Sequence, residues 1–308
     1  MKIVFMGTSE FAVKPLKKLK EAGHDILLVI TQPDKRKGRG KVFHSSPVKK
    51  VASELGLVVY QPTNINSDES VKTIAELKPD FLVVIAYGQI LKNELLGIAK
   101  YENINIHASL LPKYRGAAPI NWAIANGETV TGVTSMKITK GLDSGPILLQ
   151  RELPILESDD SISLSDKLSE MGAEILIETI NLILTGKAVY IEQDNSLSSY
   201  APILTKEIGK IDWGWDIIRI KNHVRAFKPW PGSYFYYDDQ IVKVNSIDAI
   251  ETNHDLIVGT IYKIDNDGIW VAAKNGFIII KELQFPGKKM MLTSEYLKGN
   301  RIEIGKIV

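Results

Sequence analysis

The sequence predicts two domains: a doubly wound α/β domain with a mostly parallel sheet, followed by a small OB-like β-barrel domain. Strands in the first half are continuous apolar runs rather than alternating ones, which is typical of a parallel sheet covered on both faces. These runs alternate with helical patterns, as they do in doubly wound folds. After a polar stretch, one helix and five short strands follow, which is typical of a small barrel. The 308 residues fit two domains, at about 150 residues each.

The first half contains five expected strands and four expected helices. Gly23 ends the first helix as a glycine just past a helix end does, and Ser46 with Pro47 opens the second. The strands are expected at residues 3–6, 26–31, 57–60, 81–86 and 103–107. The helices are expected at residues 11–22, 47–55, 68–77 and 90–99.

The rest of the chain changes character at a polar segment. Before it we expect a hairpin-like pair at 132–139 and 147–153 and a long helix at 164–184. The polar segment itself predicts a linker, so the domain boundaries are expected at residues 1–187, 188–205 (the linker) and 206–308. In the last domain, a helix is expected at 217–227 and strands at 233–237, 240–249, 259–265, 268–273 and 276–284.

The composition excludes several classes of protein. The chain has no cysteine, which excludes disulfides, thiolate metal sites and cysteine nucleophiles. With 38 basic and 36 acidic residues the net charge is only +2, so any nucleic acid must be bound by a local patch. No apolar run approaches the roughly 18–20 residues that span a bilayer, and the first residues fit a strand better than a secretory signal. We therefore expect a cytoplasmic protein with no membrane contact.

Three polar side chains are candidates for chemistry. Asn105 and His107 stand two residues apart at the end of an expected strand, so both side chains point to one face. Ligands of open α/β sheets bind beyond such strand ends, where an amide and an imidazole can polarise one carbonyl together. Asp143 lies in a glycine-bounded turn and can orient a histidine in an acid–base pair. The alternative is that these residues only satisfy loop amides and turn geometry.

The motif around these residues resembles the folate-dependent formyltransferase family. It reads Asn-x-His-x-Ser-Leu-Leu-Pro from Asn105, with Asp-Ser-Gly-Pro following from Asp143. The resemblance implies a Rossmann-like formyltransferase fold and catalytic roles for Asn105, His107 and Asp143. It also implies that 10-formyltetrahydrofolate donates the formyl group, that tetrahydrofolate is released and that no metal is needed. Folate binding is implied for Ser109, Leu110, Leu111 and Pro112.

Further matches favour the branch of this family that formylates the α-amine of initiator methionyl-tRNA for translation initiation. The segment 31–41 resembles the tRNA-contacting insertion of that branch, and residues 7–12 resemble its opening turn. Residues 200–202 and 225–232 resemble its linker and second-domain entry. The second domain is then expected to bind tRNA, and we expect a monomer. tRNA binding is implied for Lys35, Arg36, Lys37, Arg39, Lys41 and Lys206.

The basic loop supports the same interpretation from its residues alone. Residues 35–41 hold five cations and two glycines beside the expected strand ends. Such a loop suits a polyanionic substrate, because phosphate contacts supply much of the affinity for nucleic acids. A solvated surface loop is the alternative.

Two other functions stay open, and two kinds of nucleotide-binding site are not expected. Formyl transfer to an amino sugar on a nucleotide stays open, as does RNA binding without catalysis, although the latter leaves Asn105, His107 and Asp143 unexplained. A nicotinamide or P-loop nucleotide site is not expected, because the chain lacks the G-x-G-x-x-G and G-x-x-x-x-G-K-[ST] patterns.

Overall fold

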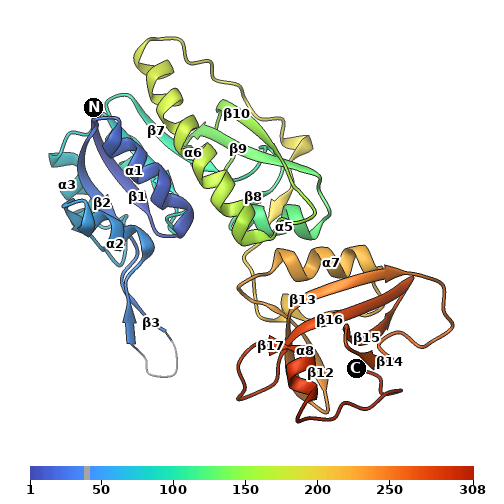
Figure 1. The fold of residues 1–308 in the computed structure, drawn as a ribbon. Coiled ribbons are helices and arrows are strands. Elements are labelled where there is room, and N and C mark those ends of the chain that lie inside the picture. The colour runs from blue at the N-terminus through green and yellow to red at the C-terminus, as the bar shows by residue number, and fades with distance from the viewer. Residues whose placement is uncertain (38–41) are drawn as a thin grey trace. The chain divides into compact units, whose positions relative to one another are not determined.

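The chain divides into two compact units in the computed structural model (Figure 1). The structure describes the backbone of residues 1–37 and 42–308, and the side chains of these residues except 36, 37 and 42. Unit 1 contains residues 1–119, 130–154 and 165–202, and unit 2 contains residues 120–129, 155–164 and 203–308. The domain boundaries expected from the sequence stay a prediction.

Unit 1 is built on a seven-stranded, mostly parallel sheet in the order β10-β9-β7-β6-β1-β2-β5. The five strands from β7 to β5 pair in parallel, and β9 and β10 add an antiparallel hairpin at the β7 edge. This arrangement confirms the predicted class of the first domain. The strands are β1 (Lys2–Gly7), β2 (Asp25–Ile30), β5 (Val59–Tyr60), β6 (Phe81–Ile85), β7 (Glu102–His107), β9 (Val130–Lys137) and β10 (Ile147–Pro154).

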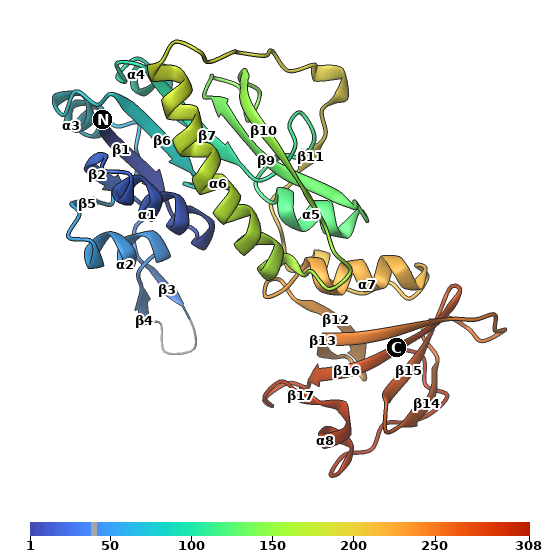
Figure 2. The same ribbon diagram turned by 45° about the horizontal axis from the view of Figure 1, so that its top comes forward.

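Helices cover both faces of this sheet. Alternate residues of β1, such as Val4 and Met6, pack with α3 and α4 on one face. On the other face Gly172 of α6 lies against Phe11, Ile106 and Val133, so α6 and the η1–α1 segment share that side (Figure 2). The helices are η1 (Glu10–Ala12), α1 (Val13–Glu21), α2 (Pro47–Glu54), α3 (Asp68–Glu76), α4 (Asn93–Leu96) and α6 (Ser161–Leu184), whose first residues count with unit 2.

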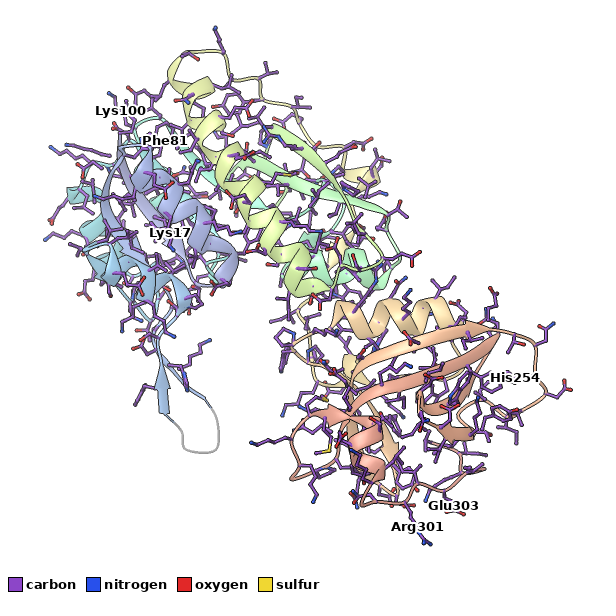
Figure 3. All side chains as sticks on the ribbon, in the orientation of Figure 1. Lys17, Phe81, Lys100, His254, Arg301 and Glu303 are labelled. Atoms are coloured by element: carbon purple, nitrogen blue, oxygen red, sulfur yellow. The ribbon has the colours of Figure 1, made fainter. Side chains whose placement is uncertain are left out.

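The buried and exposed side chains follow this layering. Phe81 of β6 is fully buried, whereas Lys17 on α1 and Lys100 before β7 are exposed (Figure 3). The sheet interior therefore consists of the apolar runs that the sequence shows.

The helix expected at residues 90–99 is much shorter than predicted. Only α4 is helical there, because the segment before it is tied to the loop that precedes α3. Ile65 N donates to Gln89 Oε1 at 2.9 Å, and Lys92 N donates to Asn66 Oδ1 at 2.8 Å. These bonds hold residues 89–92 in a non-helical path.

The basic segment after β2 is a β-hairpin rather than a plain loop. Strands β3 (Lys35–Lys37) and β4 (Val42–His44) pair in antiparallel register, with Lys35 opposite His44. At its base, Asp34 Oδ2 accepts from Lys49 Nζ at 2.7 Å and from Ser45 Oγ at 3.3 Å, and Asp34 Oδ1 accepts from Gln61 Nε2 at 2.8 Å. Strand β3 contains only Lys and Arg, and β4 has only three residues, so no strand pattern marks this hairpin in the sequence.

Much of the segment predicted as a linker is packed into unit 1. It forms η2 (Asn195–Leu197) and β11 (Tyr200–Ala201), and β11 pairs in parallel with β8 (Arg115–Gly116). The polar side chains that made it look like a loop instead bond unit 1, as described below.

Unit 2 consists of helices and an antiparallel sheet in the order β12-β13-β16-β15-β14, with β17 paired to β16. Helix α5 (Pro119–Ala125) contributes to it, since Asn121 Nδ2 donates to Ala226 O and Trp122 contacts Phe227 edge-on. The prediction of a second, small domain built on short strands is confirmed, and these strands pair in antiparallel register; no ladder joins β12 to β14 among the strands described. The remaining elements are η3 (Glu207–Gly209), α7 (Ile217–Ala226), β12 (Ser233–Tyr237), β13 (Gln240–Glu251), β14 (Ile261–Asp265), β15 (Gly268–Ala273), β16 (Gly276–Gln284), β17 (Met291–Leu292) and α8 (Thr293–Leu297).

Candidate active site

The carboxyl end of β7 brings the three predicted catalytic side chains together. Asn105 and His107 lie on the same face of β7, and the loop between β9 and β10 carries Asp143 to them. Asp143 Oδ1 accepts from Asn105 Nδ2 at 3.3 Å, and Asp143 Oδ2 lies 3.7 Å from His107 Nδ1. The Asp143 and His107 side chains are 14% and 7% exposed, so the carboxylate is close to the imidazole in a mostly desolvated place.

Asp143 is held by its backbone as well as by its side chain. Its φ of 45° lies in the left-handed region, which aspartate adopts more readily than most residues. Asp143 Oδ2 accepts from Gly116 N at 2.8 Å. Gly116 has a φ of 116°, and a Cβ there would lie 2.7 Å from Ala201 O, so only glycine fits between β11 and the carboxylate.

The protonation pattern of His107 is restricted by Tyr114. His107 Nε2 lies 2.8 Å from Tyr114 O, and a carbonyl only accepts, so Nε2 carries the hydrogen. In the neutral imidazole, Nδ1 is then an unprotonated acceptor; in the imidazolium it is a donor. Nδ1 is thus the atom of His107 that can work on a ligand or exchange a proton.

Two side chains of the Ser-Leu-Leu-Pro segment make contacts inside unit 1. Ser109 Oγ donates to Lys113 O at 2.7 Å, and Leu111 is buried with Met136 and Ile147. Leu110 and Pro112 are only half-buried. Folate binding by this segment stays a prediction, and it would use Leu110, Pro112 and backbone groups rather than the two buried side chains.

A second polar group lies at the point where the strand order of the sheet reverses, between β1 and β6. Thr8 Oγ1 donates to Tyr87 O at 2.8 Å and accepts from Gln32 N at 3.3 Å. The buried atoms Gln32 Nε2 and Tyr87 Oη have no hydrogen-bond partner among the residues described. Burial raises the pKa of Tyr87 to about 12, so the phenol keeps its proton at neutral pH. Ligands of doubly wound folds bind at such a switch point.

The predicted tRNA-binding cations are spread over both units. Lys35 is exposed at the start of β3, and Lys206 is exposed beside η3 in unit 2. Arg36 and Lys37 form the rest of β3, and Arg39 and Lys41 lie outside the described residues. The hairpin follows β2, three strand spacings from β7, which is about 14 Å across the sheet. The hairpin therefore lies at the same edge of the sheet as His107 but not next to it.

The described residues contain neither a metal-binding cluster nor a membrane-spanning helix. No group of three or more His, Asp or Glu side chains there is arranged to hold a metal ion, and independence from metals stays a prediction. No helix in the described part of the chain is long and apolar enough to cross a membrane.

Sequence analysis missed the residues that hold the candidate catalytic side chains in place. Tyr114 and Gly116 follow the Ser-Leu-Leu-Pro string directly, and a positive φ at both, 61° and 116°, is the feature that places their backbone groups on His107 and Asp143. Gln193 and Ser199 come from the segment predicted as a linker. Their contacts depend on a tertiary arrangement that no local pattern encodes.

Comparison with known proteins identifies the family. A family model described as "Formyl transferase" matches residues 1–180, and one described as "Formyl transferase, C-terminal domain" matches residues 203–301. Solved structures with the same fold include HypX from Aquifex aeolicus in complex with tetrahydrofolic acid (17% identity, TM-score 0.66, 97% of this chain and 47% of that one). Another is an N-formyltransferase from Helicobacter canadensis (22% identity, TM-score 0.66, 91% and 98%). The chain belongs to the formyl transferase family, as the motif predicted.

Relatives with much higher identity include several methionyl-tRNA formyltransferases. The methionyl-tRNA formyltransferase of Geobacter sulfurreducens is 47% identical over 306 residues, covering 99% of this chain and 96% of its own. Those of Caldanaerobacter subterraneus and Clostridioides difficile are each 47% identical and cover 100% of both chains. Over its whole length, the chain is similar to methionyl-tRNA formyltransferases.

Proposed function

We propose that this enzyme transfers a formyl group from 10-formyltetrahydrofolate to the α-amine of initiator methionyl-tRNA, which supplies formylmethionyl-tRNA for translation initiation. The meeting of Asn105, His107 and Asp143 at the end of β7 supports the reaction. The full-length similarity to methionyl-tRNA formyltransferases supports the acceptor. The enzyme works in the cytoplasm, as a monomer and without a metal in this proposal.

The three side chains divide the work of the reaction. The amine attacks the formyl carbon, a new carbon–nitrogen bond forms, and negative charge develops on the formyl oxygen. Asp143 uses one N–H of the Asn105 amide, which leaves the second N–H for that oxygen. Imidazolium His107 donates to the same oxygen through Nδ1, and each such donor typically stabilises the transition state by about 3 kcal/mol.

Proton transfer completes the exchange. The attacking amine loses a proton, which Asp143 accepts through a water molecule. Asp143 passes this proton through water to folate N10 as the bond between N10 and the formyl carbon breaks, which restores the carboxylate. Because Nε2 is occupied by Tyr114 O, His107 takes part through Nδ1 alone, on the side of Asp143.

The formyl donor lies along the carboxyl edge of the sheet in this proposal. Gln32 Nε2 and Tyr87 Oη are buried donors without partners at the switch point, and they suit a ligand with several ring nitrogens and oxygens. Leu110 and Pro112 contact the same ligand closer to Asn105. Solved structures with this fold include complexes with tetrahydrofolic acid and with folinic acid, which supports a folate as the ligand.

Cations of both units bind the tRNA in this proposal. The hairpin residues Lys35, Arg36 and Lys37, with Arg39 and Lys41 of the connecting segment, contact phosphates near the acceptor end. Lys206 and the second domain contact the tRNA further from the formylated amine.

One competition experiment tests the acceptor. The enzyme is mixed with labelled formyl donor, methionyl-tRNA and an amino-sugar nucleotide in one tube, and the products are separated. We expect label on methionyl-tRNA alone. Label on the sugar would instead support transfer to an amino sugar, although the solved sugar formyltransferases resemble this chain only in fold, at 20–22% identity.

A further inference from the structure

We propose that Gln193 is a positioning residue that holds the Asp143 carboxylate against His107, acting with the buried Arg115. This inference rests on the proposed function, because it assigns a role within the same site. Gln193 comes from the segment between the two family-model matches and lies outside the residues that carry the chemistry.

The Gln193 amide uses all of its hydrogen-bonding capacity on the two segments that hold the catalytic groups. Its Nε2 donates to Asp143 O at 3.0 Å and to Gly145 O at 2.7 Å. Its Oε1 accepts from Arg115 Nε at 3.1 Å and from Arg115 Nη2 at 2.7 Å. Only this orientation of the amide works, because Arg115 offers donors alone and the two carbonyls accept alone.

These bonds close a ring around the carboxylate. From the Arg115 guanidinium the ring runs through Gln193 to the backbone of Asp143. It returns from Asp143 Oδ2 to Gly116 N, next to Arg115 in the chain. Arg115 and Gln193 are only 4% and 9% exposed, so water does not replace these partners readily. The ring therefore fixes both the backbone and the carboxylate of Asp143.

Asp143 requires such support because its φ of 45° is unfavourable for a residue with a Cβ. Backbone of this kind persists only where the surroundings hold it. A small displacement of a catalytic group lowers kcat far more than it lowers substrate affinity. Gln193 should therefore affect the rate of formyl transfer without touching either substrate.

Gln193→Glu tests this role because it keeps an acceptor for Arg115 and removes both donors to the 143–145 loop. We expect kcat for methionyl-tRNA formylation to fall by about 10–100-fold, with KM for both substrates within about twofold of wild type. Asn195→Ala is the matched control: Asn195 is exposed and accepts from Arg115 Nη2 at 2.9 Å, yet within the described part of the chain it makes no hydrogen bond to the Asp143 loop. It should keep kcat within about twofold. Gln193→Met is measured as well, so that misfolding of one variant does not decide the outcome.

A double variant separates positioning from a general structural role. If Gln193 acts through the carboxylate, Gln193→Glu should cause no further loss of kcat in an Asp143→Ala background. A full additive loss there, or a kcat of the folded single variants close to wild type, would overturn the proposal.

Amide hydrogen exchange gives a readout that does not depend on the acceptor. The Gly116 N–H donates to Asp143 Oδ2, so its exchange should be faster in Gln193→Glu than in wild type or Asn195→Ala. Unchanged exchange would contradict the role of Gln193. If Gly116 N–H exchanges faster in Gln193→Glu but the wild-type protein does not formylate methionyl-tRNA, the positioning role of Gln193 stands and the proposed function is wrong.

Discussion

Asp143 is held in a backbone conformation that few side chains adopt, and its neighbours explain why it stays there. Gly116 N occupies one carboxylate oxygen and Asn105 Nδ2 approaches the other. Tyr114 O fixes the hydrogen of His107 on Nε2. The conformation of the 114–116 segment thereby sets both the position of the carboxylate and which ring nitrogen of His107 carries the hydrogen.

His223, unlike His107, is a core residue of unit 2. Its Nε2 donates to Ile208 O at 2.8 Å, so its Nδ1 accepts from Ser233 Oγ at 3.0 Å. Burial lowers the pKa of His223 below its usual value, and the packing of Trp215 and Phe227 on its ring leaves little room for water.

Acid should therefore destabilise unit 2 through His223. Because the pKa of His223 is lowered in the folded state, the unfolded state binds more protons near and below pH 6.5. The free energy of unfolding therefore falls as the pH drops, by up to about 1.4 kcal/mol per pH unit. His223→Gln can still donate to Ile208 O and should remove part of this acid sensitivity. Urea unfolding followed by tryptophan fluorescence between pH 8 and pH 5 measures it. The exposed His44, changed to Gln, serves as the control; equal acid sensitivity in wild type and His223→Gln would refute the assignment.

At the scale of elements, the β3–β4 hairpin depends on contacts at its base. Asp34 is the acceptor for Lys49, Ser45 and Gln61, and the hydrogen bond from Lys49 is the main reason that the pKa of Asp34 is lowered. The carboxylate is thus charged at neutral pH and joins the start of β3 to α2.

Asp34→Ala should weaken productive use of tRNA by loosening this hairpin. We expect KM for methionyl-tRNA to rise several-fold while KM for the formyl donor stays unchanged. Glu54→Ala removes the same charge from an exposed position on α2 and should leave both values as they are. Steady-state kinetics with each substrate varied in turn measures the effect. An unchanged KM for tRNA in Asp34→Ala would mean that the hairpin is a surface feature.

Elements with a strong local pattern could be predicted from sequence, and those defined by distant partners could not. The bounds predicted for β12, β15 and β16 match the structure, and Ser46 caps α2 as expected by accepting from Lys49 N at 3.0 Å. Thr179, polar within the apolar stripe of α6, bonds Ser135 of β9. By contrast β3, β4, β8 and β11 have only two or three residues each, too few to show a strand pattern, and the pairing of β8 with β11 joins distant parts of the chain.

The same difference applies to the site. Asn105 and His107 could be predicted because period-two spacing places them on one face of a strand. Asp143 could be proposed as their partner from the chemistry of a carboxylate beside a histidine and from the family motif, but no local pattern shows that its turn reaches the end of β7. Gln193 lies at a distance in the chain, in a segment whose polar side chains look like those of any linker.

At the scale of the whole molecule, the two units share the chain in an interleaved way. Residues 120–129 and 155–164 belong to unit 2, although they lie between segments of unit 1. In the proposed function, unit 1 carries the chemistry, and both units contribute cations to the tRNA. The activity is therefore expected from the full chain, and the central claim is best tested on it.

The most direct test is the rate of formyl transfer to methionyl-tRNA in a single turnover with both substrates saturating. The account predicts that His107→Ala and Asp143→Ala each lower this rate by about 10²–10⁴ relative to wild type. Thermal stability and binding of methionyl-tRNA should remain near wild type. Transfer at close to the wild-type rate by either variant, or no transfer by the wild-type chain, would contradict the account.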